Sequence, residues 1–519
     1  EHRIQIAEEH QTHRVPSKPA AKRKLAASLG YHSITKFEAE LATVSHSVRS
    51  LFETHFTLHP PDKPHPTPDL SFFESPEDAN RSLRALGEEA GVSPRTRRVF
   101  RRFRPNLLDR LQSTVEPDVV LTRLLRFVEN YGIRATLFEL LVQHPGLLDW
   151  LCRLFDSSAF ASEIAIGHPE LAEEVAQGTV LDQRLTRTQY LNAFEITLTE
   201  NPDLAPADCL RLFRAKETLR IALRDVLSIA TIEDVLIEYT ALAEACLSAC
   251  LAVVLPTAEP PLTVIALGKF GASELSYGSD LDIVFVGDNG PAAHALTAEF
   301  GRYSANGPLY ELDTRLRPEG TSGPLTAPIQ AFQQYFASRA ALWEGQALSK
   351  ARPITGPETK PFMEAATATW RRFGVADNLF KDVRTMLDKI HKHRGNGNNP
   401  LNIKANCGGI MDIELVVEAH QMKAGVWNNN TLQALDDLST QTIIPAEEAK
   451  VLERAYRLYR HLLFVLRRQE NRCVDIIPDS PSEQAKLARH LAFPSGPALM
   501  TALEEIRVQA AGACAQLLN

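Results

Sequence analysis

The stretch Gly268–Asp282, GKFGASELSYGSDLD, lies between two short apolar runs and interrupts the helical pattern on either side of it. The runs, Leu262–Leu267 (LTVIAL) and Leu281–Val286 (LDIVFV), are rich in β-branched residues, which predicts two buried strands. Glycines directly after the first run let the backbone approach a phosphate, and a following helix N-terminus would add its amides. The stretch therefore predicts a small sheet with a phosphate-binding turn.

Two carboxylates stand at the start of the second run. Asp280 and Asp282 are two residues apart, and residues i and i+2 of a strand face the same side. A third, Asp313, lies in Tyr310–Arg315 (YELDTR), which predicts the next strand. Converging carboxylates are costly unless a cation lies between them, and Mg²⁺ prefers such oxygen ligands. These three aspartates are therefore the candidate catalytic and metal-binding residues, and together they could hold two ions.

Each part of this arrangement has an ordinary alternative when taken alone. An isolated Asp-x-Asp pair is more often a surface turn, and a glycine turn after a strand is usually only a turn. The order is more specific, because a strand, a Gly-Lys turn, an Asp-x-Asp strand and a further Asp-bearing strand follow one another. In that order Gly268, Lys269 and Ser279 are candidates for contacts with a triphosphate, and the combination favours metal-dependent nucleotidyl transfer.

Helical periodicity dominates the rest of the chain. Apolar residues recur at i, i+3, i+4 and i+7 in Val119–Tyr131, Leu137–Phe155 and Val451–Arg468. The predicted fold class is therefore α+β and predominantly helical, with a small mixed sheet flanked by helical bundles. The proline-rich stretch His59–Pro68 (HPPDKPHPTP) predicts an extended linker. Four segments are expected: a helical tail at 1–58, a helical region at 59–240, a nucleotidyltransferase domain at 241–358 and a helical bundle at 359–519.

Composition narrows the class of protein. The net charge is −8, which argues against wholesale nucleic-acid binding because such binding needs a basic face. No apolar run approaches the roughly 18 residues of a membrane span, and no signal peptide opens the chain. The seven cysteines are scattered, and neither they nor His391 and His393 have the spacing of a metal site. We expect a cytoplasmic protein with no nucleic-acid or membrane partner.

Two further features have ordinary interpretations. The basic run Arg95–Arg104 (RTRRVFRRFR) predicts a solvated helix face rather than a binding site for an acidic partner. Trp343 is interpreted as a core residue rather than a platform for stacking a base.

The two ends of the chain resemble each other. Lys24–Tyr31 has the sequence KLAASLGY and Lys486–Phe493 has KLARHLAF, at an offset of 486 − 24 = 462 residues. The same offset pairs further residues without a gap: Pro16 with Pro478, Leu41 with Leu503 and Val44 with Ile506. A shared proline and an ungapped register favour a duplication over a chance likeness of two helices. The N-terminal segment, predicted to be helical already at Glu1–Glu9, would then be the tail of a first copy inside a larger protein.

At this point the segment Gly268–Phe285 (GKFGASELSYGSDLDIVF) resembles the DNA polymerase β nucleotidyltransferase superfamily, and more closely the bacterial glutamine synthetase adenylyltransferase family. Three further motifs of that family follow in order: Leu312–Leu325 (LDTRLRPEGTSGPL), Trp343–Arg352 (WEGQALSKAR) and Lys404–Glu414 (KANCGGIMDIE). The resemblance covers nearly the whole chain. Ala272 stands where that family usually has glycine, and Phe270 where it usually has leucine.

The resemblance implies a polymerase-β-like transferase domain and adds candidate residues to the site. They are Arg315 and Arg317 near the site, Lys350 and Arg352 as contacts to ATP, and Asp412 and Glu414 approaching from the C-terminal helices. A structural ion pair, a solvated helix face or a helix cap is the alternative for each of them.

Proteins of this family are similar to a tandem duplication. One half removes AMP from glutamine synthetase by phosphorolysis, and the other adds AMP from ATP to a tyrosine of glutamine synthetase. SYGSDLD and GGIMDIE resemble the second, adding copy. The resemblance therefore implies protein adenylylation with Mg²⁺ as cofactor, and PII signal proteins and glutamine as candidate regulators. Phosphorolytic deadenylylation, a catalytically silent regulator-binding module and another acceptor such as a PII protein remain the alternatives.

Overall fold

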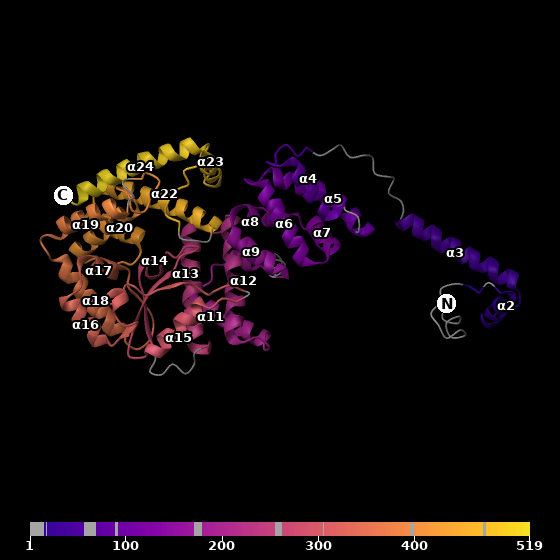
Figure 1. Ribbon diagram of the computed structural model, residues 1–519, viewed down its shortest axis with the longest axis horizontal. Helices are drawn as coiled ribbons and strands as arrows, with labels where there is room; N and C mark the ends of the chain where they lie inside the picture. Colours follow the sequence, from indigo (N-terminus) through magenta and orange to yellow (C-terminus); the bar gives the residue numbers. More distant parts are fainter. Residues whose placement is uncertain are drawn as a thin grey trace. The chain divides into compact units, whose positions relative to one another are not determined.

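The computed structural model describes residues 15–16, 18–56, 69–88, 92–170, 179–254, 262–304, 306–394, 399–470 and 474–519. Helices surround one mixed sheet (Figure 1). The predicted fold class, α+β and predominantly helical, is confirmed. Contacts divide the chain into two units, residues 1–69 and 70–519.

The first unit contains the helices α2 (Pro19–Ser28) and α3 (Ile34–Phe56). Leu25 and Ala26 of α2 pack against Phe37 of α3 in a small apolar core. The helix predicted at Glu1–Glu9 and the linker predicted at His59–Pro68 lie outside the described residues.

The same helix–turn–helix recurs at the C-terminal end of the second unit. The helices α23 (Pro481–His490) and α24 (Gly496–Leu517) begin 481 − 19 = 462 and 496 − 34 = 462 residues after α2 and α3. The turn residue at positive φ is Gly30 (+87°) in the first pair and Ala492 (+57°) in the second. The backbone of the two segments thus supports the 462-residue repeat.

Helices also precede the sheet in the second unit. They are α4 (Pro76–Gly87), α5 (Pro94–Gln112), α6 (Pro117–Tyr131), α7 (Arg134–Gln143), α8 (Pro145–Ser157), α9 (Ala159–Gly167), α11 (Arg187–Glu200), α12 (Pro206–Val226) and α13 (Ile232–Ala249). Proline begins many of them, at a position where its missing N–H leaves no hydrogen bond unmade. The predicted helix Leu137–Phe155 is wrong in one respect: it divides into α7 and α8 at His144, because Pro145 disfavours helical backbone in the residue before it.

Helix α5 confirms the interpretation of the basic run. Phe100 and Phe103 face the core, whereas Arg98, Arg101 and Arg102 are exposed on the opposite side.

Helix α13 belongs to the protein interior. The segment Ile232–Ala252 is long and apolar enough to cross a membrane, yet 72% of its most apolar window is buried. α11 and α12 pack along it. The buried carboxylate of Glu238 in α13 pairs with Arg220 of α12 at 2.5 Å and with Arg224 at 3.1 Å.

The sheet has the order β3–β2–β1–β5, with β4 also paired to β2. Its strands are β1 (Thr263–Ala266), β2 (Leu281–Val286), β3 (Leu312–Asp313), β4 (Thr326–Ala327) and β5 (Arg352–Thr355). β1 is antiparallel to β2 and β5, while β3 and β4 are parallel to β2. β3 is shorter than the predicted Tyr310–Arg315, because the Arg315 amide turns back and donates to Asp313 Oδ1 at 2.8 Å.

The two faces of the sheet enter different cores. Val264 of β1 packs with the helices that precede the sheet, whereas its neighbour Ile265 packs against the helices that follow. The short helix α14 (Gly268–Gly271) lies between β1 and β2. The later helices are α15 (Gly290–Gly301), α16 (Ile329–Ser338), α17 (Leu342–Ala347), α18 (Thr359–Gly374), α19 (Leu379–Arg394), α20 (Ile410–Ala424), α21 (Thr431–Thr440) and α22 (Ala446–Glu470). The domain boundaries at 240 and 358 stay predictions.

Replacing Glu238 with alanine should lower the free energy of unfolding by about 3–5 kcal/mol, because Arg224 would lose the counter-charge of its buried guanidinium and Arg220 would keep only Glu217. Urea denaturation followed by circular dichroism measures the change. Glu233→Ala is the matched control on the same helix, since the Glu233–Arg457 pair is exposed and surface pairs contribute about 0–1 kcal/mol. Equal effects of the two substitutions would contradict a special role for the buried pair.

Candidate active site

A cavity of about 810 Å³ lies between the sheet and the helices α17, α19, α20 and α22. Small-molecule sites commonly measure about 300–1,000 Å³, so a nucleotide fits this volume. Asp280, Asp282 and Asp313 all line the cavity, as do Gly268 and Ser279. The turn and the two carboxylate-bearing strands predicted from sequence therefore meet in one place.

The three carboxylates crowd one another. Asp282 and Asp313 are direct partners on the parallel strands β2 and β3, and Asp280 immediately precedes β2. Burial, with the charges of Asp280 and Asp313, raises the pKa of Asp282 to about 7. Hydrogen bonds from Arg315 instead lower the pKa of Asp313. Such crowding of oxygen ligands is typical of a site for a divalent cation.

The turn after β1 depends on its first glycine. Gly268 has φ +51°, and a Cβ atom there would lie 2.1 Å from Asp282 Oδ2. Glycine is therefore required for the turn to approach the carboxylate so closely. The two departures from the family pattern fit their places, since Phe270 is fully buried in the core and Ala272 has φ −72°, which any residue adopts.

Lys269 points to the C-terminal helices rather than being free in the cavity. Its Nζ donates to Glu414 of α20, and lies 3.1 Å from Glu274 Oε2 and 2.9 Å from the Tyr456 hydroxyl of α22. Burial lowers the pKa of Lys269, against the charges of Glu414 and Glu274. Burial alone would raise the pKa of Glu274, but nearby cations, Lys269 first, hold it below its usual range. This group ties the turn to α20 and α22.

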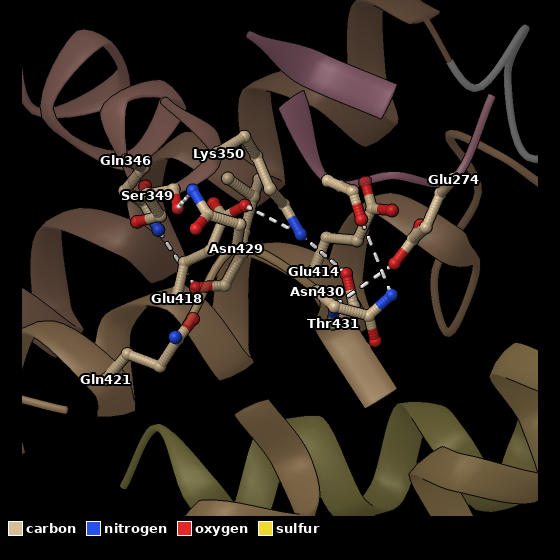
Figure 2. A network of polar contacts seen from close by, with 12 residues as sticks. Glu274, Gln346, Ser349, Lys350, Glu414, Glu418, Gln421, Asn429, Asn430 and Thr431 are labelled. Carbon is tan, nitrogen blue, oxygen red and sulfur yellow. Dashed lines mark hydrogen bonds and ion pairs between the residues drawn. The ribbon is translucent and has the colours of Figure 1, made fainter. Parts of the chain in front are cut away.

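Lys350 belongs to a second part of the same network (Figure 2). Its Nζ donates to Thr431 Oγ1 at 2.6 Å, and the Thr431 amide donates to Glu274 Oε1 at 3.1 Å. Lys350 is only 6% exposed and lines the cavity, so the alternative of a solvated helix face is wrong for this residue. Glu418 of α20 lies 3.9 Å from Lys350, and burial raises the pKa of Glu418 to about 8.

Three arginines predicted near the site have structural partners. Arg352 donates to the carbonyls of Gly271 and Phe270 at 2.9 and 2.8 Å, and Arg317 donates to the carbonyls of Thr314 and Gly323. Neither is among the residues that line the cavity. Arg315 lines the cavity but is paired with Asp313. Arg352 and Arg317 therefore shape the turns beside the cavity, and their predicted contacts with a nucleotide remain untested.

Sequence reasoning missed a group of basic residues that line the same cavity, which we call the cationic wall. Its members are Lys389 and Arg394 of α19, Lys404 of the loop before α20, and Arg460 and Arg467 of α22. Arg460 is 8% and Arg467 5% exposed, in register with the buried Tyr456 and Leu463 of the same helix. The sequence did contain a signal for Arg460 and Arg467. Both lie on the apolar face of an amphipathic helix, and positions on such a face are rarely charged without a function.

Trp343 and Asp412 are two further residues from the sequence analysis whose positions the structure gives. Trp343 is 49% exposed and lines the cavity, so its interpretation as a core residue is wrong. Asp412 lies in the first turn of α20, where its Oδ2 accepts a hydrogen bond from the Gly408 amide at 2.8 Å and its Oδ1 lies 2.7 Å from His391 Nε2. Glu414, two residues further along α20, lines the cavity.

Comparison with known proteins places this geometry in a family. The model of the glutamate–ammonia ligase adenylyltransferase family matches residues 148–366, which include all five strands and the three carboxylates. A bifunctional glutamine synthetase adenylyltransferase/adenylyl-removing enzyme of Methylococcus capsulatus is 30% identical over 91% of this chain. Residues 148–366 belong to the glutamate–ammonia ligase adenylyltransferase family. Enzymes of the same name from Thioalkalivibrio sulfidiphilus and Chromobacterium violaceum are 27% and 29% identical, over 95% and 92% of this chain.

The chain spans 56–58% of the length of these three curated relatives. A second model, GlnD PII-uridylyltransferase, matches it twice, at residues 1–56 and 382–518. The two matches end 518 − 56 = 462 residues apart, which is the offset of the repeat. The cationic wall lies in the second match, and the carboxylates lie in the adenylyltransferase match.

Replacing Gly268 with alanine should weaken divalent-cation binding by at least about tenfold, because the new Cβ displaces the Asp282 carboxylate from its position. Titration with Mn²⁺, followed by electron paramagnetic resonance, measures the affinity. Gly425→Ala is the matched control, since Gly425 also has positive φ (+74°) but open space around it. Unchanged Mn²⁺ affinity in Gly268→Ala would contradict this role of the glycine.

Replacing Glu418 with glutamine should stabilise the protein more at pH 9 than at pH 6. The raised folded-state pKa means that Glu418 binds its proton more tightly when folded, so its contribution to stability is lost as pH rises towards about 8. Glutamine keeps the neutral form, and the gain between the two pH values should be about 1–3 kcal/mol. Urea denaturation at both pH values tests this, with the exposed Glu364→Gln as control. A gain that is the same at both pH values would refute it.

Proposed function

We propose that this chain transfers AMP from ATP to a tyrosine hydroxyl of glutamine synthetase, and so regulates nitrogen assimilation. One observation carries the proposal: three carboxylates and the cationic wall line the same cavity, which is large enough for a nucleotide. Family membership and the adenylyltransferase activity named for the relatives support it.

The donor set fits Mg²⁺. Asp280, Asp282 and Asp313 offer hard oxygen ligands, and a divalent cation would offset the repulsion and burial that raise the pKa of Asp282 to about 7. When bound, the ion would neutralise charge on the phosphates as it develops in the reaction.

The cationic wall would bind the triphosphate. Lys389 and Arg394 are exposed at the cavity, and their side chains form no hydrogen bond or ion pair within the described part of the chain. Charge-assisted bonds from such groups orient phosphates strongly. The phosphates would thus lie between the cation held by the carboxylates and the basic side chains of the cationic wall.

The nucleoside would lie at the apolar end of the cavity. Trp343 presents half of its surface there, together with Met386, Ile390 and Leu415. An aromatic ring can stack on a purine, and each stacked base typically contributes about 1–3 kcal/mol.

The reaction moves one adenylyl group from ATP to the tyrosine oxygen, and the tyrosine hydroxyl loses one proton. The tyrosine oxygen attacks the α-phosphorus of ATP and forms a new P–O bond, while the bond from that phosphorus to the bridging oxygen breaks and pyrophosphate leaves. An unperturbed tyrosine has a pKa near 10, so its hydroxyl needs help to lose the proton. Asp280 and Asp313, which line the cavity, would orient that hydroxyl.

Regulation and location are part of the same proposal. The second matched model is named for a PII-uridylyltransferase, which supports PII signal proteins, and with them glutamine, as regulators. The six described cysteines are free thiols, which is consistent with the cytoplasm as the proposed location.

Replacing Asp280 with asparagine should lower AMP transfer by at least about a hundredfold without unfolding the protein, because a charged ligand is lost from the carboxylate group. Mass spectrometry of glutamine synthetase after incubation with the chain and ATP–Mg²⁺ measures the added AMP. Asp288→Asn is the control, since Asp288 is exposed just beyond β2. Near-normal transfer by Asp280→Asn would overturn the assignment.

Two alternatives have different outcomes in the same system. Release of ADP from AMP-modified glutamine synthetase with phosphate, and no transfer from ATP, would show the reverse activity, which the relatives' name also includes. No rise in melting temperature with ATP–Mg²⁺ would favour a silent regulator-binding module.

A further inference from the structure

A second group of metal-ligand side chains lies behind the wall of the active cavity. It consists of His391 of α19, Cys407 of the loop before α20, and Asp412 of α20. The ligand atoms of the three residues all lie within 4.8 Å of one another. None of these residues belongs to the three-carboxylate group, and none lines the active cavity.

A tight turn holds the cysteine and the aspartate together. The Gly408 amide donates to Asp412 Oδ2 at 2.8 Å, and the Cys407 amide donates to Asn406 Oδ1 at 2.9 Å. Gly408 has φ +76°, and a Cβ atom there would lie 2.3 Å from the carbonyl oxygen of Arg507 in α24. The turn is therefore packed so closely that only glycine fits, and the positions of Cys407 and Asp412 are fixed before any ligand binds.

The donor types select the class of ion. Imidazole, thiolate and carboxylate together suit Zn²⁺ and similar borderline divalent ions, whereas Mg²⁺ takes oxygen ligands only. In a tetrahedral zinc site the nitrogen and oxygen ligands are about 3.3 Å apart. His391 Nε2 and Asp412 Oδ1 are 2.7 Å apart, so binding requires a small outward movement of one side chain.

We propose that His391, Cys407 and Asp412 bind one Zn²⁺ or a similar divalent transition-metal ion, separate from the magnesium site of the transferase reaction. On binding, the Cys407 thiol and the hydrogen bond between His391 and Asp412 each release a proton. Three protein ligands leave a fourth position for water.

The site would position the cationic wall. The residues next to the ligands, Ile390 and Met411, line the active cavity, as do Lys389 and Arg394 on the helix of His391. An ion shared by α19 and α20 would therefore fix the part of the cationic wall that α19 carries. We assign it a positioning role, because its ligands do not face the cavity.

Cobalt spectroscopy of the full chain tests the proposal. The protein is stripped of metal with a chelator, kept reduced with a phosphine, and titrated with Co²⁺ in excess Mg²⁺, which occupies the carboxylates. Only a cysteine ligand gives a thiolate-to-cobalt charge-transfer band. We expect this band at one equivalent of Co²⁺, and its displacement by Zn²⁺. A folded wild-type chain without the band would overturn the proposal.

Variants assign the ligands. Cys407→Ser should abolish the band, and His391→Gln and Asp412→Asn should each weaken Co²⁺ binding by more than about tenfold, since even outer-shell partners of a metal contribute about that much. Controls are Cys209→Ser, a cysteine buried in α12, and His393→Ala, an exposed histidine on the helix of His391. Zn²⁺ should raise the melting temperature of the wild type but not of Cys407→Ser.

A band that survives in Cys407→Ser, or that is lost in Cys209→Ser, would overturn the assignment. Circular dichroism of each variant confirms the fold, and His391→Gln decides the question if Cys407→Ser proves unstable.

Discussion

The ammonium group of Lys269 is held by carboxylates from two distant parts of the chain, Glu274 just beyond the turn and Glu414 on α20. A largely buried ammonium without counter-charges would be costly, so the turn keeps its place only while α20 is packed against it. Tyr456 of α22 bonds to the same atoms and brings in the longest C-terminal helix. One polar cluster thus fixes the turn, the sheet and the C-terminal helices relative to one another, and both walls of the cavity depend on it.

The sequence predicted what depends on neighbours along the chain. Two strands follow from short β-branched runs, and the convergence of Asp280 and Asp282 follows from their spacing. The predicted third strand, Tyr310–Arg315, is too long, because β3 ends at Asp313. The Asp313 side chain accepts a hydrogen bond from the Arg315 amide there, and hydrophobic periodicity does not predict this contact. The single helix expected through His144 is wrong, because Pro145 interrupts it even though the apolar pattern continues across the proline.

What could not be predicted depends on residues far apart in sequence. The helix position of Arg460 shows in the sequence, but its partner does not: Arg460 donates to the Glu274 carbonyl at 2.7 Å only because α22 packs against the turn. Lys350 was a candidate ATP contact, and its hydrogen bond to Thr431 likewise depends on packing. His391 and Cys407 had no visible partner, since Asp412 completes the group only once α19 and α20 lie side by side. The carboxylates of the site lie close to one another in the sequence, whereas its cations come from segments that are far from the carboxylates in the sequence.

The active cavity is a junction between two pieces that different families share. Its carboxylate wall lies in the segment that matches the adenylyltransferase model, and its cationic wall in the segment that matches the PII-uridylyltransferase model. A substitution in one segment can therefore alter one wall of the cavity and leave the other wall unchanged. The ion pair between Lys269 and Glu414 crosses the junction, so a change of charge at either residue disturbs both segments at once.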